Sequence, residues 1–115
     1  MENRYLCKAK RTANGEWVEG SLVPTGSESC IVSWDAKIYF VDLSTRCQCT
    51  GYEGIYEKDI FQCDDERYLI VWNDCSLSWE ARSVYSSESV SLGEFDPKEI
   101  DVIGNEIDNP ELLEV

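Results

Sequence analysis

Short apolar runs bounded by turn-forming residues alternate along the whole chain, and no long stretch holds a helical period. The clearest turn signal is Asn14-Gly15, which lies between the apolar runs at residues 5–10 and 17–23. Asn-Gly tolerates the positive φ that a type I′ turn requires at both of its central positions. The pattern therefore predicts a β-hairpin over residues 4–23.

Similar runs predict strands in the middle of the chain. Two are expected at residues 30–34 and 37–42, joined by a turn at Asp35-Ala36. The polar residues 42–45 are expected to begin a loop. The stretch CQCTGYEGIYEKDIF, residues 47–61, is interpreted as a strand, a tight turn and the start of the next strand.

The alternation continues toward the C-terminus. Strands are expected at residues 68–72, 77–82 and 100–107, and Gly104 is expected to mark a bulge in the last of them. Residues 83–91 contain five serines, which predicts either a mobile loop or a weak edge strand.

Helical signals are confined to two places near the C-terminus. Asp96-Pro97 and Asn109-Pro110 each offer an N-cap residue followed by a proline at the first helical position. Leu112 and Leu113 follow the second cap, and at least one of them is expected to dock on the sheet. The whole pattern predicts a mainly β fold: a small, partly open barrel or sandwich of short antiparallel strands, with one or two short helical pieces near the C-terminus.

Composition adds limits to this picture. A chain of 115 residues, 43% of them hydrophobic, suits one domain with its own core, so a single domain is expected over residues 1–115. No apolar run approaches the roughly 18 residues of a membrane helix, and the first residues lack the apolar core of a signal peptide. We therefore expect a cytoplasmic protein without membrane association, whose six cysteines are thiols and mostly buried.

Candidate catalytic and metal-binding chemistry is sparse. The chain has no histidine, which removes the usual general base and the commonest metal ligand. Glu57 and Asp59 form the best carboxylate pair, and a solvated loop pair is favoured over an acid–base pair. Cys47 and Cys49 are too close for an ordinary zinc knuckle. A cysteine- or metal-dependent enzyme is thus the weakest hypothesis, and we expect no catalytic residue, bound metal or cofactor.

The charge of the chain is lopsided. Ten basic and 23 acidic residues give a net charge of −13, and residues 94–115 alone carry eight acids and one base. This field would repel a phosphate backbone, so direct nucleic-acid binding is not expected. The simplest interpretation is a solubilising surface. A more specific interpretation is that the acids form a face that binds a basic protein partner. The alternative is that the chain is an acidic nucleic-acid mimic that inhibits a DNA-binding host protein. The residues expected to form this face are Glu99, Asp101, Glu106, Asp108 and Glu111.

Three blocks of the sequence stand in a recognisable order. The first is RYLCKA at residues 4–9 with WVEG at 17–20, and the second runs from DLST at 42–45 through QCTG and IYEKDI to VW at 71–72. The third and most specific is VIGNEIDNPELL at residues 102–113. Together they resemble the YopX-like family of phage and prophage proteins.

The sequence departs from this family at two positions and in one turn, which is shortened here to Tyr52-Glu53-Gly54. The family usually has tyrosine at the place of Cys49 and glycine at the place of Lys58. Cys49 is therefore expected to fill packing space, and Lys58 argues against a functional backbone geometry around Asp59. The resemblance implies a small, mainly β accessory protein of a mobile element, in the cytoplasm of a bacterial host and without an established activity. Its expected partner is a host protein, or a second copy in a homo-oligomer.

Overall fold

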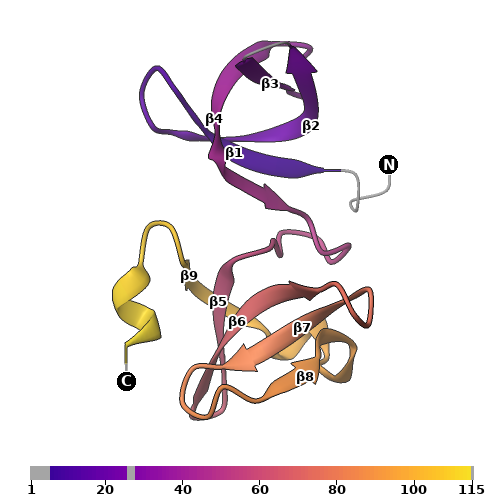
Figure 1. The fold of residues 1–115 in the computed structure, drawn as a ribbon, viewed down its shortest axis with the longest axis vertical. Coiled ribbons are helices and arrows are strands. Elements are labelled where there is room, and N and C mark those ends of the chain that lie inside the picture. Colours follow the sequence, from indigo (N-terminus) through magenta and orange to yellow (C-terminus); the bar gives the residue numbers. More distant parts are fainter. Residues whose placement is uncertain (1–5, 26–27, 115) are drawn as a thin grey trace. The chain divides into compact units, whose positions relative to one another are not determined.

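The computed structural model describes residues 6–25 and 28–114, most of which lie in antiparallel strands (Figure 1). The mainly β class predicted from the sequence is confirmed, and the helical pieces of the described chain are short 3₁₀ turns. No helix in these ranges is long and apolar enough to cross a membrane. The chain divides into two units, one ending at Tyr56 and the other beginning at Glu57. The single domain expected from chain length stays a prediction.

The first unit is a barrel in which each strand pairs with the next and the last returns to the first, so it is closed rather than partly open. Its strands are β1 (Cys7–Arg11), β2 (Trp17–Thr25), β3 (Glu28–Val32) and β4 (Ile38–Gln48). Its buried interior consists of Cys7, Ala9, Ile31 and Val41, with Val18 and Leu22 packed against them. Because side chains alternate between the two faces of a strand, these positions fix which residues point outward.

Closure of the barrel depends on a close approach between β2 and β3 at Gly20. A Cβ atom at this position would overlap the Val32 carbonyl oxygen and would lie 2.9 Å from Cγ2 of Ile31. Any larger residue would therefore push the two strands apart.

The hairpin predicted over residues 4–23 is confirmed from residue 6 onward, and residues 4–5 lie outside the described residues. The predicted type I′ turn is wrong, because Gly15, at φ 74°, is the only residue of this turn with a positive φ. Four residues connect Arg11 to Glu16, whose carbonyl oxygen accepts from the Arg11 N–H at 2.8 Å. The Asn14 side chain instead accepts from the Glu16 N–H at 3.0 Å, which stabilises this longer turn.

The prediction that residues 42–45 begin a loop is also wrong, because β4 continues through these residues to Gln48. The pairing with β1 jumps from Lys10 opposite Asp42 to Lys8 opposite Cys47, so the residues between them form a bulge. The Thr45 hydroxyl accepts from the Lys10 N–H at 2.8 Å and donates to the Asp42 carbonyl oxygen at 2.6 Å. A side chain thus takes the place of a backbone partner, which lets a polar segment stay within the strand.

The stretch at residues 47–61 has the predicted form. It contains the end of β4, a turn with Gly51 and Gly54 at positive φ, and the start of β5. The two arms of the turn meet in a bridge between Cys49 and Tyr56.

The second unit is a five-stranded antiparallel sheet in the order β8-β7-β6-β5-β9. Its strands are β5 (Asp59–Cys63), β6 (Glu66–Asn73), β7 (Ser78–Ser83), β8 (Ser89–Ser91) and β9 (Asp101–Asn105). Its 3₁₀ turns are η2 (Leu92–Glu94), η3 (Pro97–Glu99) and η4 (Pro110–Leu113). The serine-rich segment supplies β8, so of the two interpretations left open the weak edge strand holds.

An aromatic cluster lies in the core of the second unit. The rings of Phe61, Tyr68 and Phe95 lie with their centroids 5.2 Å apart in each pair. Phe61 is fully buried, as are Ile70 and Ala81 on the neighbouring strands. Phe95 follows η2, so the packing of its ring ties the irregular segment after β8 to the sheet.

The two helix starts predicted at Asp96-Pro97 and Asn109-Pro110 are confirmed in position, and each forms a short 3₁₀ turn. Asp96 caps η3 by accepting from the Lys98 N–H at 3.0 Å, and the Glu99 side chain accepts in return from the Asp96 N–H. The bulge in β9 falls beside the expected Gly104, because Ile60 faces Gly104 and Phe61 faces Val102.

The segment after β9 docks back on the sheet through Leu112, as expected. A Cβ atom at Gly104 would lie only 2.9 Å from Cδ1 of Leu112 and 2.6 Å from Oδ1 of Asn109, so this glycine makes room for the segment. The Arg67 guanidinium also holds this segment, by donating to the Leu112 carbonyl oxygen at 3.0 Å.

Candidate binding surfaces

The cysteines occupy packing positions. Cys47 and Cys49 are fully buried, which agrees with the expectation that Cys49 fills space in the interior. Burial raises the pKa of the Cys7 thiol, so this side chain stays protonated at neutral pH. Within residues 6–25 and 28–114, no three cysteine, aspartate or glutamate side chains come together to hold a metal ion. The absence of a bound metal stays a prediction.

The carboxylate pair at Glu57 and Asp59 is not the solvated pair that the sequence favoured. Asp59 is only 2% exposed and lies opposite Asn105, another buried polar residue, whereas Glu57 is half-buried. Lys58, between the two carboxylates, has a φ of 72°, in the left-handed region. The turn at Lys58 therefore places the two carboxylates in different environments.

Lys58 keeps the left-handed backbone that a glycine would adopt more readily. Its N–H donates to the Ile70 carbonyl oxygen at 3.0 Å, and its carbonyl oxygen accepts from the Glu106 N–H at 2.9 Å. These two bonds hold the backbone between β6 and the end of β9 despite the unfavourable φ. Lysine is therefore compatible with a defined backbone geometry before Asp59, and the expectation that this geometry is not functional stays a prediction. The family glycine was the signal that could have indicated this geometry.

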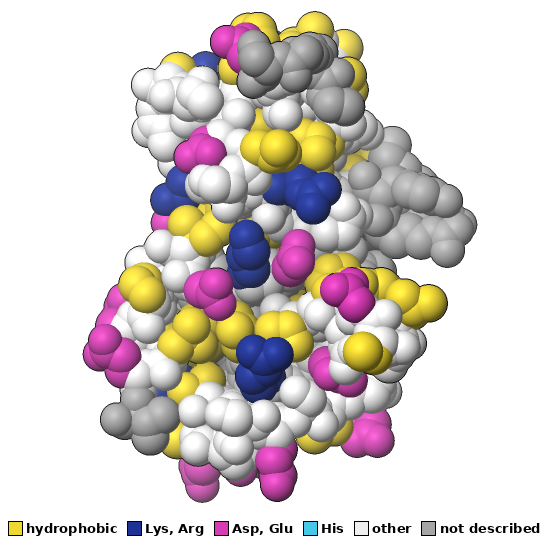
Figure 2. All heavy atoms as spheres, in the orientation of Figure 1, with side chains coloured by type: hydrophobic (Ala, Val, Ile, Leu, Met, Phe, Trp, Pro, Cys, Tyr) yellow, Lys and Arg dark blue, Asp and Glu magenta, His cyan; other side chains and the backbone are white. Residues whose placement is uncertain are grey.

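Acidic charge is concentrated in the second unit. Residues 57–115 carry 16 acidic and four basic side chains, a net charge of −12, whereas residues 1–56 carry seven acidic and six basic ones. Figure 2 shows acidic side chains over the visible face of the second unit, in the lower half of the view. The five residues predicted to form an acidic face, Glu99, Asp101, Glu106, Asp108 and Glu111, are all exposed.

The backbone at both ends of β9 holds these carboxylates in defined positions. Glu99 belongs to the capping box of η3, before the strand. After the strand, the Asn105 side chain donates to the Asp108 carboxylate at 3.3 Å and accepts from the Asp108 N–H at 2.8 Å. Asn105 itself is buried. The acidic side chains are thus carried on an ordered frame.

The acidic field extends to the turn between β5 and β6. Partial burial and the neighbouring carboxylates of Asp64 and Glu99 raise the pKa of the Cys63 thiol. Gln62 pairs with Asp101, so the end of β5 that leads to Asp64 lies beside the start of β9 that follows Glu99, at one end of the sheet. This extension was missed because it depends on the pairing of β5 with β9.

The three basic side chains of β1 lie against aromatic rings. Lys8 Nζ is 4.8 Å from the centroid of the Trp17 ring and 4.9 Å from that of Tyr56, and Lys10 Nζ is 5.4 Å from the Trp17 ring. Burial and a hydrogen bond to the Glu19 carboxylate raise the pKa of Tyr56, so its hydroxyl stays protonated. These contacts stabilise the outer surface of β1 and β2 through cation–π interactions.

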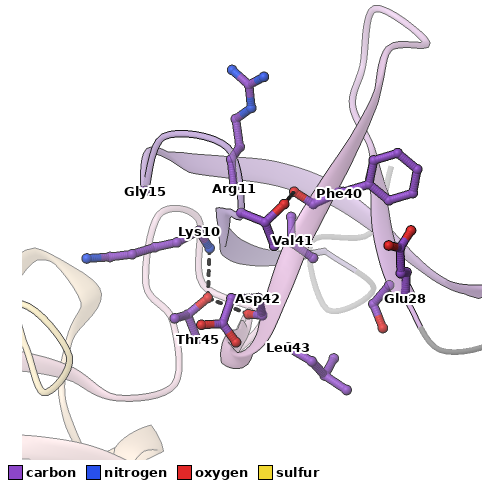
Figure 3. Close-up of a pocket in the computed structure, with 11 residues that line it drawn as sticks. Lys10, Arg11, Gly15, Glu28, Phe40, Val41, Asp42, Leu43 and Thr45 are labelled. Carbon is purple, nitrogen blue, oxygen red and sulfur yellow. Dashed lines mark hydrogen bonds between the residues drawn. The ribbon is translucent and has the colours of Figure 1, made fainter.

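A hollow of about 560 Å³ lies where the bulge of β4 meets the end of β1 (Figure 3). Asp42 and Thr45 line it from the bulge, and Phe40 and Leu43 add apolar surface. Hydrogen bonds from the N–H and hydroxyl of Ser44 lower the pKa of Asp42, so this carboxylate stays ionised. The lining is therefore mixed, with charged, polar and apolar side chains. The hollow was missed in the sequence because the bulge was interpreted as a loop.

Comparison with known proteins assigns the family. No curated protein matches the chain. The family model described as YopX protein matches residues 47–114, from the end of β4 through the whole second unit to η4. Of the three sequence blocks, the second lies mostly and the third entirely within this range. The first block, at residues 4–20, lies before it. Because the match covers more than half of the sequence, the chain belongs to the YopX family.

Proposed function

We propose that this chain is a non-enzymatic binding protein whose acidic face recognises a partner protein with a basic surface. The observation that carries the proposal is the unequal distribution of charge, with −12 on residues 57–115 and −1 on residues 1–56. We also propose that it acts in the cytoplasm of a bacterial host as a phage or prophage accessory protein, which is what membership of the YopX family suggests.

The physical basis is electrostatic steering. A surface of one sign raises the local concentration of an oppositely charged partner and accelerates association by about 10- to 1,000-fold at low salt. Exposed ion pairs add little energy individually, so the value of the face lies in a pattern of several fixed charges. The capping box at Glu99 and the Asn105–Asp108 bonds supply this fixed pattern.

The alternative is an acidic mimic of nucleic acid. The same carboxylates would then occupy the phosphate-binding groove of a DNA-binding host protein. The two proposals differ in one measurable property, because DNA would displace a mimic from its target but would leave an ordinary protein partner in place.

An affinity-capture experiment tests the proposal. The immobilised chain is exposed to the basic fraction of a bacterial lysate, namely the proteins retained by a cation-exchange resin. The test variant neutralises the acidic face by changing Glu99, Asp101, Glu106, Asp108 and Glu111 to the corresponding amides. The control variant makes the same change at five exposed acids that lie outside the acidic face and its extension to Asp64: Glu16, Glu53, Asp74, Glu88 and Glu94.

The two variants have equal net charge, so any difference between them reports on position. We expect specific proteins to be captured by the wild type and the control and to be lost from the test variant. Equal loss from both variants would show that overall charge, and not this face, is responsible. Release of the captured proteins by added DNA would favour the mimic, and a gel shift of random-sequence DNA by the chain alone would contradict both proposals.

A further inference from the structure

The hollow beside the β4 bulge combines a carboxylate with exposed apolar side chains (Figure 3). Val41 points into the barrel interior, so the alternation of side chains places its neighbours Phe40 and Asp42 on the outer side of β4. Leu43 adds a second apolar side chain to the lining. Phe40 and Leu43 are each 52% exposed, so a ligand in the hollow can reach both of them.

The Asp42 carboxylate keeps one oxygen available for a ligand. The N–H and the hydroxyl of Ser44 both donate to Oδ1, at 3.0 and 2.7 Å. Oδ2 accepts no hydrogen bond from residues 6–25 and 28–114. Because the bonds from Ser44 lower the pKa of Asp42, the carboxylate is charged at neutral pH. An oriented, ionised carboxylate of this kind is a strong acceptor for a cationic donor.

The basic residues that line the hollow have their charged ends against aromatic rings. Lys10 lies opposite Asp42 in the register of β1 and β4, yet its Nζ is 5.4 Å from the centroid of the Trp17 ring. The Arg11 guanidinium lies over the Tyr39 ring, with Cζ 4.7 Å from the centroid. Figure 3 shows both basic side chains extending away from Asp42. Neither charge is therefore directed at this carboxylate.

A second carboxylate lies at the same end of the barrel. Ser29 of β3 is opposite Val41 of β4, and Glu28 and Asp42 are the next residues beyond this pair. Glu28 is exposed and also lines the hollow. Two neighbouring carboxylates repel each other, and a cation that binds beside them relieves this repulsion. The hollow thus offers negative charge and apolar walls together.

We propose that this hollow binds an alkyl guanidinium or alkyl ammonium group. The charged end donates to Oδ2 of Asp42 beside the Phe40 ring, and the alkyl part packs on Leu43. A guanidinium combines donors suited to a carboxylate with a flat face that stacks on an aromatic ring. A bare metal ion would use only the oxygen atoms and leave the apolar walls without a role. The inference is independent of the acidic face, because it uses only residues of the barrel.

An NMR titration of the nitrogen-15-labelled chain with n-butylguanidinium tests the proposal. We expect saturable shifts of the amide signals of residues 40–45, with a dissociation constant on the order of 1 mM for so small a ligand. The uncharged isostere n-butylurea should leave these signals unchanged at the same concentrations. Asp42→Asn keeps an acceptor for Ser44 but removes the charge, and should weaken binding about tenfold or more. Phe40→Leu keeps the apolar bulk but removes the ring, and should weaken it about two- to fivefold.

The matched control is Asp35→Asn, which should bind like the wild type. Asp35 is also an exposed carboxylate of the barrel with a pKa lowered by a bond from a serine, Ser33. It differs in being paired with Lys37, whose Nζ lies 3.6 Å from Oδ2, and in lying outside the hollow.

A blocked peptide, acetyl-Gly-Arg-Gly-amide, distinguishes the two sources of the cation. If the peptide binds as tightly as n-butylguanidinium, the result supports a protein side chain as the ligand, whereas binding of n-butylguanidinium alone supports a free cation. The proposal is overturned if neither produces saturable shifts at residues 40–45, if n-butylurea binds equally well, or if Asp42→Asn binds no more weakly than Asp35→Asn. If Asp42→Asn loses the strand-rich circular dichroism spectrum, Phe40→Leu and the comparison of the two isosteres on the wild type decide the outcome.

Discussion

The docking of the C-terminal segment on β9 can be tested by changing both sides of one contact. Leu112→Ala removes the side chain that packs over Gly104. A fully buried leucine changed to alanine costs about 2–5 kcal/mol, including the cavity that it leaves. Leu112 is half-buried, so we expect a loss of about 1–2 kcal/mol in the free energy of unfolding. The Arg67 bond should survive, because it is made to the backbone carbonyl oxygen of Leu112.

The reverse change is Gly104→Ala. The new Cβ atom would lie 2.9 Å from Cδ1 of Leu112 and 2.6 Å from Oδ1 of Asn109, so the segment must move away. Overpacking of this kind costs about 1–3 kcal/mol. The double variant should cost less than the sum of the single variants, because removal of the Leu112 side chain relieves part of the overlap.

Urea unfolding followed by tryptophan fluorescence and circular dichroism measures these free energies, and agreement between the two probes checks that one transition is observed. The control is Leu77→Ala, at an exposed leucine, which should remain within about 0.5 kcal/mol of the wild type. The reasoning is refuted if Leu112→Ala behaves like this control and Gly104→Ala is neutral. Strict additivity of the two changes would also show that the residues do not contact each other.

Three further outcomes follow from individual residues. Lys58→Gly should be more stable than Lys58→Ala by about 0.5–1 kcal/mol in urea unfolding, because only glycine adopts a φ of 72° without strain; equal stabilities would contradict this. Ser44→Ala should raise the pKa of Asp42 toward its ordinary value of 3.8, measured by carboxyl NMR, because two hydrogen bonds to the ionised form are weakened or lost; an unchanged titration would refute the assignment. In the native protein under reducing conditions, a thiol reagent should label Cys75 first and the half-buried Cys63 more slowly, with the four buried cysteines reacting only after unfolding; rapid labelling of all six would show that the core is open.

The sequence predicted the fold wherever a local signal decides the structure. Asn14-Gly15 located the first hairpin, and the Asp96-Pro97 signal located a 3₁₀ turn with a capping box. The choice of a four-residue turn over a type I′ turn was not predictable in the same way, because it depends on how the Asn14 side chain is used. Thr45 shows the same limit, since its hydroxyl replaces a backbone partner only after β1 and β4 have paired.

The candidate surfaces, too, were predictable only where they do not depend on how strands pair. The acidic residues near the C-terminus were visible in the sequence, and their exposure follows from charge. Their extension to Asp64 requires the pairing of β5 with β9, which periodicity does not reveal. The exposure of Ile38 and Phe40 was equally hidden, because an apolar run such as residues 38–41 fits a strand buried on both faces as well as one with an exposed apolar side. Only the closed barrel decides between them.

Carbodiimide cross-linking tests the central claim, that the acidic face contacts a basic protein, most directly. This reagent joins a carboxylate to a lysine amine without a spacer, so it records only carboxylates in contact with the partner. The chain, together with the basic lysate proteins that it captures, is cross-linked and the joined peptides are identified by mass spectrometry. We predict intermolecular links concentrated at Glu99, Asp101, Glu106, Asp108 and Glu111. Links spread evenly over the exposed acids of both units, or concentrated at Asp74 and Glu88 away from this face, would contradict the account.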